Sequence, residues 1–136
     1  MTASDRATRL VRLAAEAAGD KLADEILAYD VSDQLVITDA FVLCSAANDR
    51  QVRAIVDEIE KRLREEADAK PVRREGEREG RWILLDYVDV IVHVQHEEER
   101  AFYALERLWK DCPVIALPES VNAHNSGGPR LGSPRG

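Results

Sequence analysis

Two segments of the chain carry apolar residues at helical spacing. After Ser4, which can cap a helix, apolar residues recur at offsets of three and four as far as Gly19. Asn48 resembles a second cap with Gln51 at the third helical position, and apolar residues follow at the same offsets to Leu63. The opposite face of this second segment carries charges of both signs, as a solvated surface does. The pattern therefore predicts amphipathic helices that begin at Ser4 and at Asn48.

Runs of β-branched and aromatic residues predict strands. Residues 35–44 are typical of one strand with an irregular entry, and residues 82–85 and 88–94 are typical of adjacent strands joined by a tight turn. The segment between the first helix and these strands is ambiguous. Residues 21–27 still permit a helix, whereas residues 26–31 also fit a short strand. Both interpretations stay open from the pattern alone.

The remaining segments complete the predicted order. Residues 73–80 form a charged loop punctuated by glycine, and the acidic run at residues 97–99 suits the start of a third helix that ends before Pro113. The order helix, strand, strand, helix, strand, strand, helix predicts an α/β fold with a single mixed β-sheet flanked by helices. The 136 residues allow one domain, which we expect at residues 1–118. Residues 119–136 are too poor in apolar groups to pack and are expected to form a disordered tail.

Charge narrows the class of partner. The formal net charge is -7, which disfavours broad contact with a phosphate backbone because such binding draws on many Lys and Arg contacts. We therefore expect a protein partner and little direct nucleic-acid contact. Cys44 and Cys112 have no paired spacing and are expected to be reduced structural thiols. With no apolar run long enough for a membrane span and no leader pattern, the sequence predicts a soluble, cytoplasmic protein.

Candidate catalytic or metal-binding residues are few. His93 and His96 form a short H-x-x-H, but an offset of three on a strand points to opposite faces, and no motif places a third ligand. Asp86 and Asp89 flank the predicted turn and could in principle hold magnesium, although aspartates that form turns are far commoner. No active site is assembled by these residues, so we expect no cofactor and no enzymatic activity.

The strand that begins at Trp82 is apolar on both faces. Trp82, Leu84 and Asp86 share one face, and Ile83 and Leu85 share the other. Tryptophan is enriched at protein interfaces because its large flat ring contributes much contact area. Either both faces of this strand are buried, or the Trp82 face is a docking surface.

Several motifs resemble one known family. Residues 82–94, WILLDYVDVIVHV, are followed by residues 100–109, RAFYALERLW. The supporting segments are Leu22-Ala23-Asp24, Asp30-Val31-Ser32, Thr38-Asp39-Ala40-Phe41-Val42, Asn48-Asp49-Arg50-Gln51-Val52 and Glu75-Gly76. In this order and spacing, from the first helix to about Pro113, the chain resembles the ribosomal silencing factor family, also called RsfS or Iojap.

The resemblance implies both a fold and a role. The fold would be nucleotidyltransferase-like without the catalytic residues, with a strand at residues 26–31. Family members bind large ribosomal subunit protein fourteen and sterically block association with the small subunit, which represses translation under nutrient limitation. They are often homodimers when free.

Carried over by motif, the docking surface would comprise Trp82, Leu84 and Asp86, with Tyr87 and Asp89 nearby. Val88 stands where many relatives carry glycine, so the turn can differ from theirs. Two alternatives stay open. One is a small nucleotidyltransferase-like or metal-dependent enzyme that would use Asp86, Asp89 and His93, and the other is a general dimeric interaction scaffold.

Overall fold

One mixed sheet forms the centre of the molecule. The computed structural model describes residues 2–121. The strands are β1 (Asp24–Asp30), β2 (Ala40–Ala46), β3 (Arg73–Glu75), β4 (Trp82–Asp86) and β5 (Val90–His96), in the spatial order β1-β2-β5-β4-β3. The β2–β5 pair is parallel and the other pairs are antiparallel. The predicted α/β fold with a single mixed sheet is confirmed.

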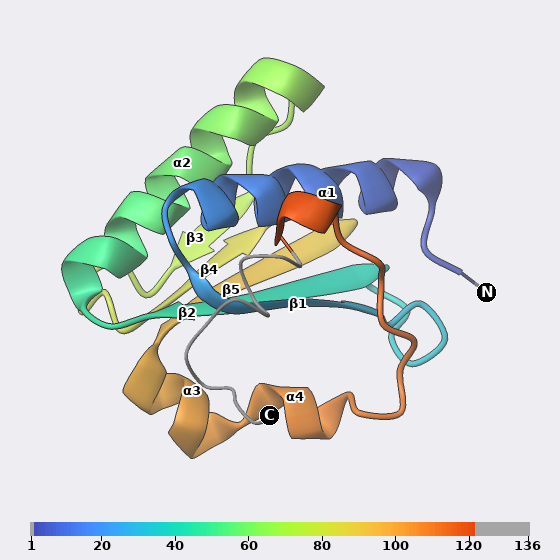
Figure 1. Ribbon diagram of the computed structural model, residues 1–136. Coiled ribbons are helices and arrows are strands. Elements are labelled where there is room, and N and C mark those ends of the chain that lie inside the picture. Colours follow the sequence, from blue (N-terminus) through green and yellow to red (C-terminus); the bar gives the residue numbers. More distant parts are fainter. Residues whose placement is uncertain (1, 122–136) are drawn as a thin grey trace.

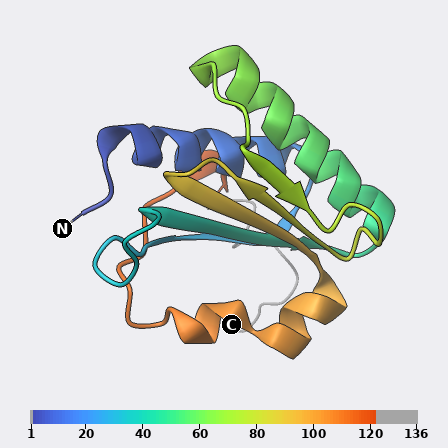
Figure 2. The ribbon, with the colours of Figure 1, turned by 180° about the vertical axis from the view of Figure 1, so that it is seen from behind.

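Helices cover both faces of this sheet. The helices α1 (Asp5–Asp20) and α2 (Asp49–Ala67) lie side by side on one face, and α3 (Glu97–Tyr103) and α4 (Leu105–Leu108) lie on the opposite face (Figures 1 and 2). Both predicted caps are confirmed. The Ser4 hydroxyl accepts from the Ala7 amide at 3.1 Å, and the Asn48 side chain accepts from the Gln51 amide at 2.8 Å. Each cap satisfies an amide that the helix itself leaves unpaired.

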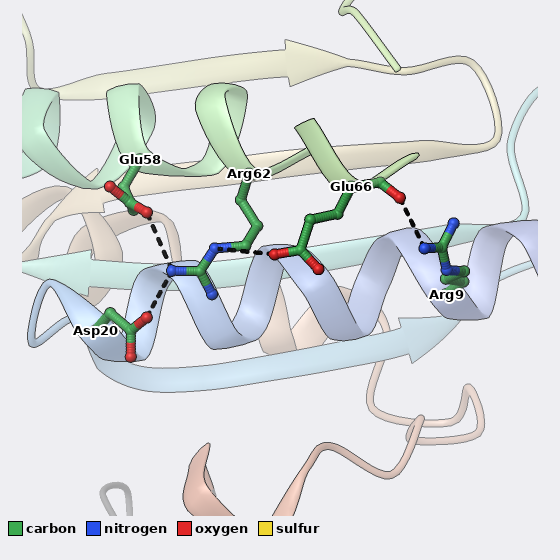
Figure 3. A network of polar contacts seen from close by, with 5 residues as sticks. All are labelled: Arg9, Asp20, Glu58, Arg62 and Glu66. Atoms are coloured by element: carbon green, nitrogen blue, oxygen red, sulfur yellow. Dashed lines mark hydrogen bonds and ion pairs between the residues drawn. The ribbon is translucent and has the colours of Figure 1, made fainter. Parts of the chain in front are cut away.

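Ion pairs and hydrogen bonds of charged side chains connect α1 to α2. Arg62 of α2 donates to Asp20 of α1 at 2.6 Å and to Glu58, one turn earlier, at 3.0 Å (Figure 3). Arg62 also approaches Glu66 at 4.0 Å, and Arg9 of α1 donates to the Glu66 carbonyl oxygen at 2.7 Å. These contacts hold the two helices in register above the sheet.

The ambiguous segment after α1 resolves as a strand. Leu22 leaves the helix with φ 62 and is 64% exposed, and the chain then enters β1 at Asp24. The helical interpretation of residues 21–27 is therefore wrong. The strand that the family resemblance implied is present, with its start two residues earlier than expected.

Three other local predictions are wrong. Residues 35–37 belong to a loop in which Val36 and Ile37 are 102% and 77% exposed, so β propensity failed where no neighbouring strand was available to pair. Residues 73–75, expected in a loop, form β3 because their backbone pairs with β4. The predicted third helix breaks at Ala104, which has φ 46, and so becomes α3 and α4.

The core consists of a large and a small hydrophobic cluster on opposite faces of the sheet. The upper face is the one covered by α1 and α2, and the lower face is the one beneath which α3 and α4 lie (Figure 1). The upper cluster fills the space between the sheet and helices α1 and α2, and it includes Val121, three residues beyond the predicted domain boundary. The remainder of the predicted tail, residues 122–136, lies outside the described residues. The lower cluster joins Tyr29, Phe41 and Cys112 to Trp109 just after α4. Because α3 packs beneath β2 and β5, the β4 and β3 side of the lower face has less helical cover.

Candidate docking surface

The two faces of β4 have different environments. Ile83 and Leu85 are fully buried in the upper core, whereas Trp82, Leu84 and Asp86 are only partly buried on the lower face. The alternation therefore separates a packing face from a partly exposed face. Of the two interpretations of this strand, the one that buries both faces completely does not hold.

Trp82 is fixed on this face by two ring contacts and one hydrogen bond. Its indole Nε1 donates to His93 Nδ1 at 3.1 Å, and the two ring centroids lie 5.9 Å apart. On the α3 side, the Tyr103 ring lies at 4.9 Å, with the planes tilted by 50°. The indole is thus held in a defined orientation, and the side chain remains only partly buried.

Two hollows flank Trp82. One, of about 290 Å³, is lined by Glu75, Gly76, Trp82 and Leu84. The other, of about 230 Å³, is lined by Gly76, Glu79, Arg81, Trp82 and Glu99. Both hollows combine the indole with carboxylates. Such a surface suits an apolar contact bordered by basic side chains of another protein.

Asp86 lies at the end of β4 with partners in its own chain. One carboxylate oxygen accepts from the Val88 amide at 2.8 Å, and the other lies 3.3 Å from Arg73 of β3. Val88 itself has φ 72, in the left-handed region that favours glycine. The turn thus requires a glycine-type conformation, and this chain meets that requirement with a strained valine.

The two remaining predicted site residues lie elsewhere. Tyr87 is 5% exposed and belongs to the upper core, and burial raises the pKa of its hydroxyl above the ordinary value. Asp89 follows the turn and lies 3.5 Å from Arg6 of α1. The structure therefore brings Trp82, Leu84 and Asp86 together, and it places Tyr87 and Asp89 apart from them.

Sequence reasoning missed two aromatic residues beside Trp82. Phe102 and Tyr103 of α3 are 82% and 49% exposed, and their rings meet edge to face at 5.0 Å. Consecutive positions on a helix point about 100° apart, and two adjacent aromatics are therefore a signal that one of the rings can lie outside the core.

The candidate catalytic residues do not form a recognisable centre. His93 is 6% exposed, and burial lowers its pKa to about 4. His96 caps α3 by accepting from the Glu98 amide at 3.1 Å. Within residues 2–121, no group of three His, Cys, Asp or Glu side chains could hold a metal ion. Nor is any helix in this part of the chain long and apolar enough to cross a membrane.

An α/β module with an aromatic, partly exposed strand face has the features of a protein-binding domain. Comparison with known families gives a specific identity: the family described as "Ribosomal silencing factor during starvation" matches residues 4–130. The chain therefore belongs to the ribosomal silencing factor family, and the resemblance seen in its motifs is confirmed.

Individual relatives agree with this assignment. The "Ribosomal silencing factor RsfS" of Halalkalibacterium halodurans is 40% identical over 108 residues, which cover 79% of this chain and 92% of that protein. The protein of the same name from Bacillus subtilis is 40% identical over 116 residues, covering 83% and 95%. A crystal structure of a Chromobacterium violaceum protein superposes with a TM-score of 0.72 at 31% identity, covering 75% of this chain and 84% of that one.

Proposed function

We propose that this chain binds the large ribosomal subunit through large ribosomal subunit protein fourteen and sterically blocks association with the small subunit. The result would be repression of translation under nutrient limitation, in the cytoplasm. Membership of the ribosomal silencing factor family supports the ribosome as the target. The chain acts as a binding protein in this proposal, not as an enzyme.

The Trp82 face carries the proposal. Trp82 and Leu84 present apolar surface beside the exposed Phe102 and Tyr103, so a contiguous aromatic area is open on this side of the described chain. Aromatic anchors at the centre of an interface typically contribute on the order of 2 kcal/mol or more. Such an area favours a protein partner that can bury it.

Charge supports a basic protein over RNA. Glu75, Glu79 and Glu99 line the hollows beside Trp82, where Arg73 pairs with Glu75 and Arg81 pairs with Glu99. The excess of negative charge comes from the whole chain, whose formal net charge is -7. Carboxylates at the rim of an interface attract basic side chains and repel phosphates. On this basis we assign little direct nucleic-acid contact to the complex.

Replacing Trp82 by Ala tests the proposal. Loss of the anchor should weaken co-sedimentation with purified large subunits about thirtyfold and abolish inhibition in a subunit-joining assay. Val36→Ala is the matched control, because it removes a fully exposed apolar side chain from a loop outside this surface. A folded Trp82→Ala protein that binds and inhibits as the wild type does would refute the site.

We also propose that the free chain is a homodimer. Sedimentation equilibrium of the free chain tests this directly, and a monomer mass at micromolar concentration would contradict it. Repeating the measurement with Trp82→Ala tells whether the aromatic area takes part in the dimer.

A further inference from the structure

His93 lies directly behind the partly buried Trp82. It belongs to β5, where it pairs with Leu84 of the neighbouring β4, and Trp82 is the diagonal neighbour on the same face. Its Nδ1 accepts the indole hydrogen bond of Trp82 at 3.1 Å. The bond therefore connects a residue on the partly exposed surface to one that is only 6% exposed.

The imidazole ring is held in one orientation. The Phe41 ring meets it edge to face at 5.3 Å, and the Trp109 ring, which packs against Phe41, lies at 6.1 Å. Its Nε2 is buried and has no hydrogen-bond partner within residues 2–121. The bond to Trp82 is thus the hydrogen bond that this ring makes in the described chain. Because the packed imidazole cannot rotate, its Nδ1 stays in one place and holds the Trp82 indole N–H in one direction.

The hydrogen bond also sets the protonation state of the ring. An indole N–H can only donate, so Nδ1 must be unprotonated and the ring hydrogen must lie on Nε2. Burial lowers the pKa of His93 to about 4, which keeps the ring neutral near pH 7. The acceptor is consequently available under ordinary conditions.

We propose that His93 is a positioning residue, whose buried ring fixes the Trp82 indole in the orientation that the docking surface offers to its protein partner. This inference rests on the proposed function and extends it to a residue that does not touch the partner. A fixed indole loses little freedom on binding, and pre-organisation of this kind increases affinity without a new contact. His93 would act only through Trp82.

The free protein provides the first test. In a nitrogen-15 spectrum, the two tryptophans give two indole N–H signals, and the signal that is lost in Trp82→Phe identifies Trp82. His93→Phe keeps a buried ring but removes the acceptor, so the Trp82 signal should move and its exchange with water should rise at least about tenfold. His93→Asn restores an oxygen acceptor and should recover part of the protection. An unchanged Trp82 signal in His93→Phe overturns the proposal.

Binding to large subunits provides the second test. His93→Phe should weaken binding by about fivefold to tenfold, and His93→Asn should recover part of that loss. His96→Asn is the control: His96 is also a buried histidine that accepts a hydrogen bond, but its contact is the α3 cap, and asparagine can cap as well. This control should leave both the indole signal and the affinity unchanged.

A double-mutant cycle separates positioning from a general structural role. In a Trp82→Phe background the donor is absent, so adding His93→Phe should have little further effect on binding. Equal losses in both backgrounds would overturn the proposal, as would normal binding by a folded His93→Phe protein. If His93→Phe does not fold, the cycle is run with His93→Leu, which also removes the acceptor. Undiminished binding by Trp82→Ala would instead refute the proposed function, so the two failures are distinguishable.

Discussion

Gly76 offers a sharp test of the backbone geometry around the docking surface. It has φ 90, and a Cβ atom built at this position would lie 1.9 Å from the Trp82 carbonyl oxygen and 2.9 Å from the Trp82 carbonyl carbon. Both of these atoms belong to the backbone of β4. No change of side-chain rotamer can relieve the overlap, so Gly76→Ala must displace either the loop or the strand.

Two contributions lower the free energy of unfolding in Gly76→Ala. A left-handed conformation costs about 1–2 kcal/mol for a residue with a Cβ, and overpacking against fixed atoms costs about 1–3 kcal/mol. A third contribution opposes them: alanine lowers the conformational entropy of the unfolded chain, which stabilises the folded state by about 0.4–1 kcal/mol. The free energy of unfolding should therefore fall by roughly 2–4 kcal/mol, a large share of the 5–15 kcal/mol typical of a domain.

Urea unfolding followed by circular dichroism measures this change. Gly19→Ala is the matched control, because Gly19 lies in α1 and its nearest neighbours would be 3.9 Å from a new Cβ. The helical substitution should stabilise the chain by up to about 1 kcal/mol. Opposite signs for the two glycines are expected. A Gly76→Ala chain as stable as the wild type would refute the close approach to β4.

Three further measurements test separate features of the structure. At position 88, where φ is 72, glycine should be about 1 kcal/mol more stable than alanine in urea unfolding, and the reverse order would contradict the left-handed turn. Asn48→Ala removes the cap of α2 and should cost about 1 kcal/mol in the same assay, whereas no loss would mean that the cap is dispensable. Burial lowers the pKa of His93 from 6.5 to about 4, so the unfolded chain binds more protons between these values. Stability should fall as pH drops through this window, by up to about 3 kcal/mol, and His93→Phe should lose that share of the pH dependence; parallel curves for the two chains would refute it.

Local signals accounted for the elements that the sequence predicted correctly. Ser4 and Asn48 each combine a capping side chain with a long apolar period, and both act within one turn of helix. The alternation along β4 also assigned Ile83 and Leu85 to the packing face. Each of these features depends on residues close in sequence, which is why the pattern was sufficient.

The features that were missed depend on distant partners. β3 has three charged residues and exists through its pairing with β4, whereas the apolar Val36 and Ile37 have no such strand beside them. The break at Ala104 has no glycine or proline to mark it. Propensity alone could not have located any of these.

In the candidate site, too, the sequence located the features that depend on nearby residues and missed those that depend on distant ones. The family motifs indicated Trp82, Leu84 and Asp86, which share one face of a regular strand. Tyr87 lies in the turn, where alternation no longer specifies a face, and it enters the core instead. The contact between Trp82 and His93 requires the register of β4 against β5, which a single sequence does not provide.

The borders of the sheet restrict how this protein can assemble with anything else. At one border, Val114 pairs with Tyr29, and the Ile115 amide donates to the Ala28 carbonyl oxygen at 2.9 Å, so part of the β1 backbone is occupied. At the other border, β3 spans only Arg73–Glu75, and a short, charged strand is a poor template for another strand. Recognition by strand addition is thus disfavoured at both ends. Recognition of a partner therefore depends on side chains, which makes it sensitive to single substitutions, and the same borders disfavour strand-by-strand aggregation of the chain.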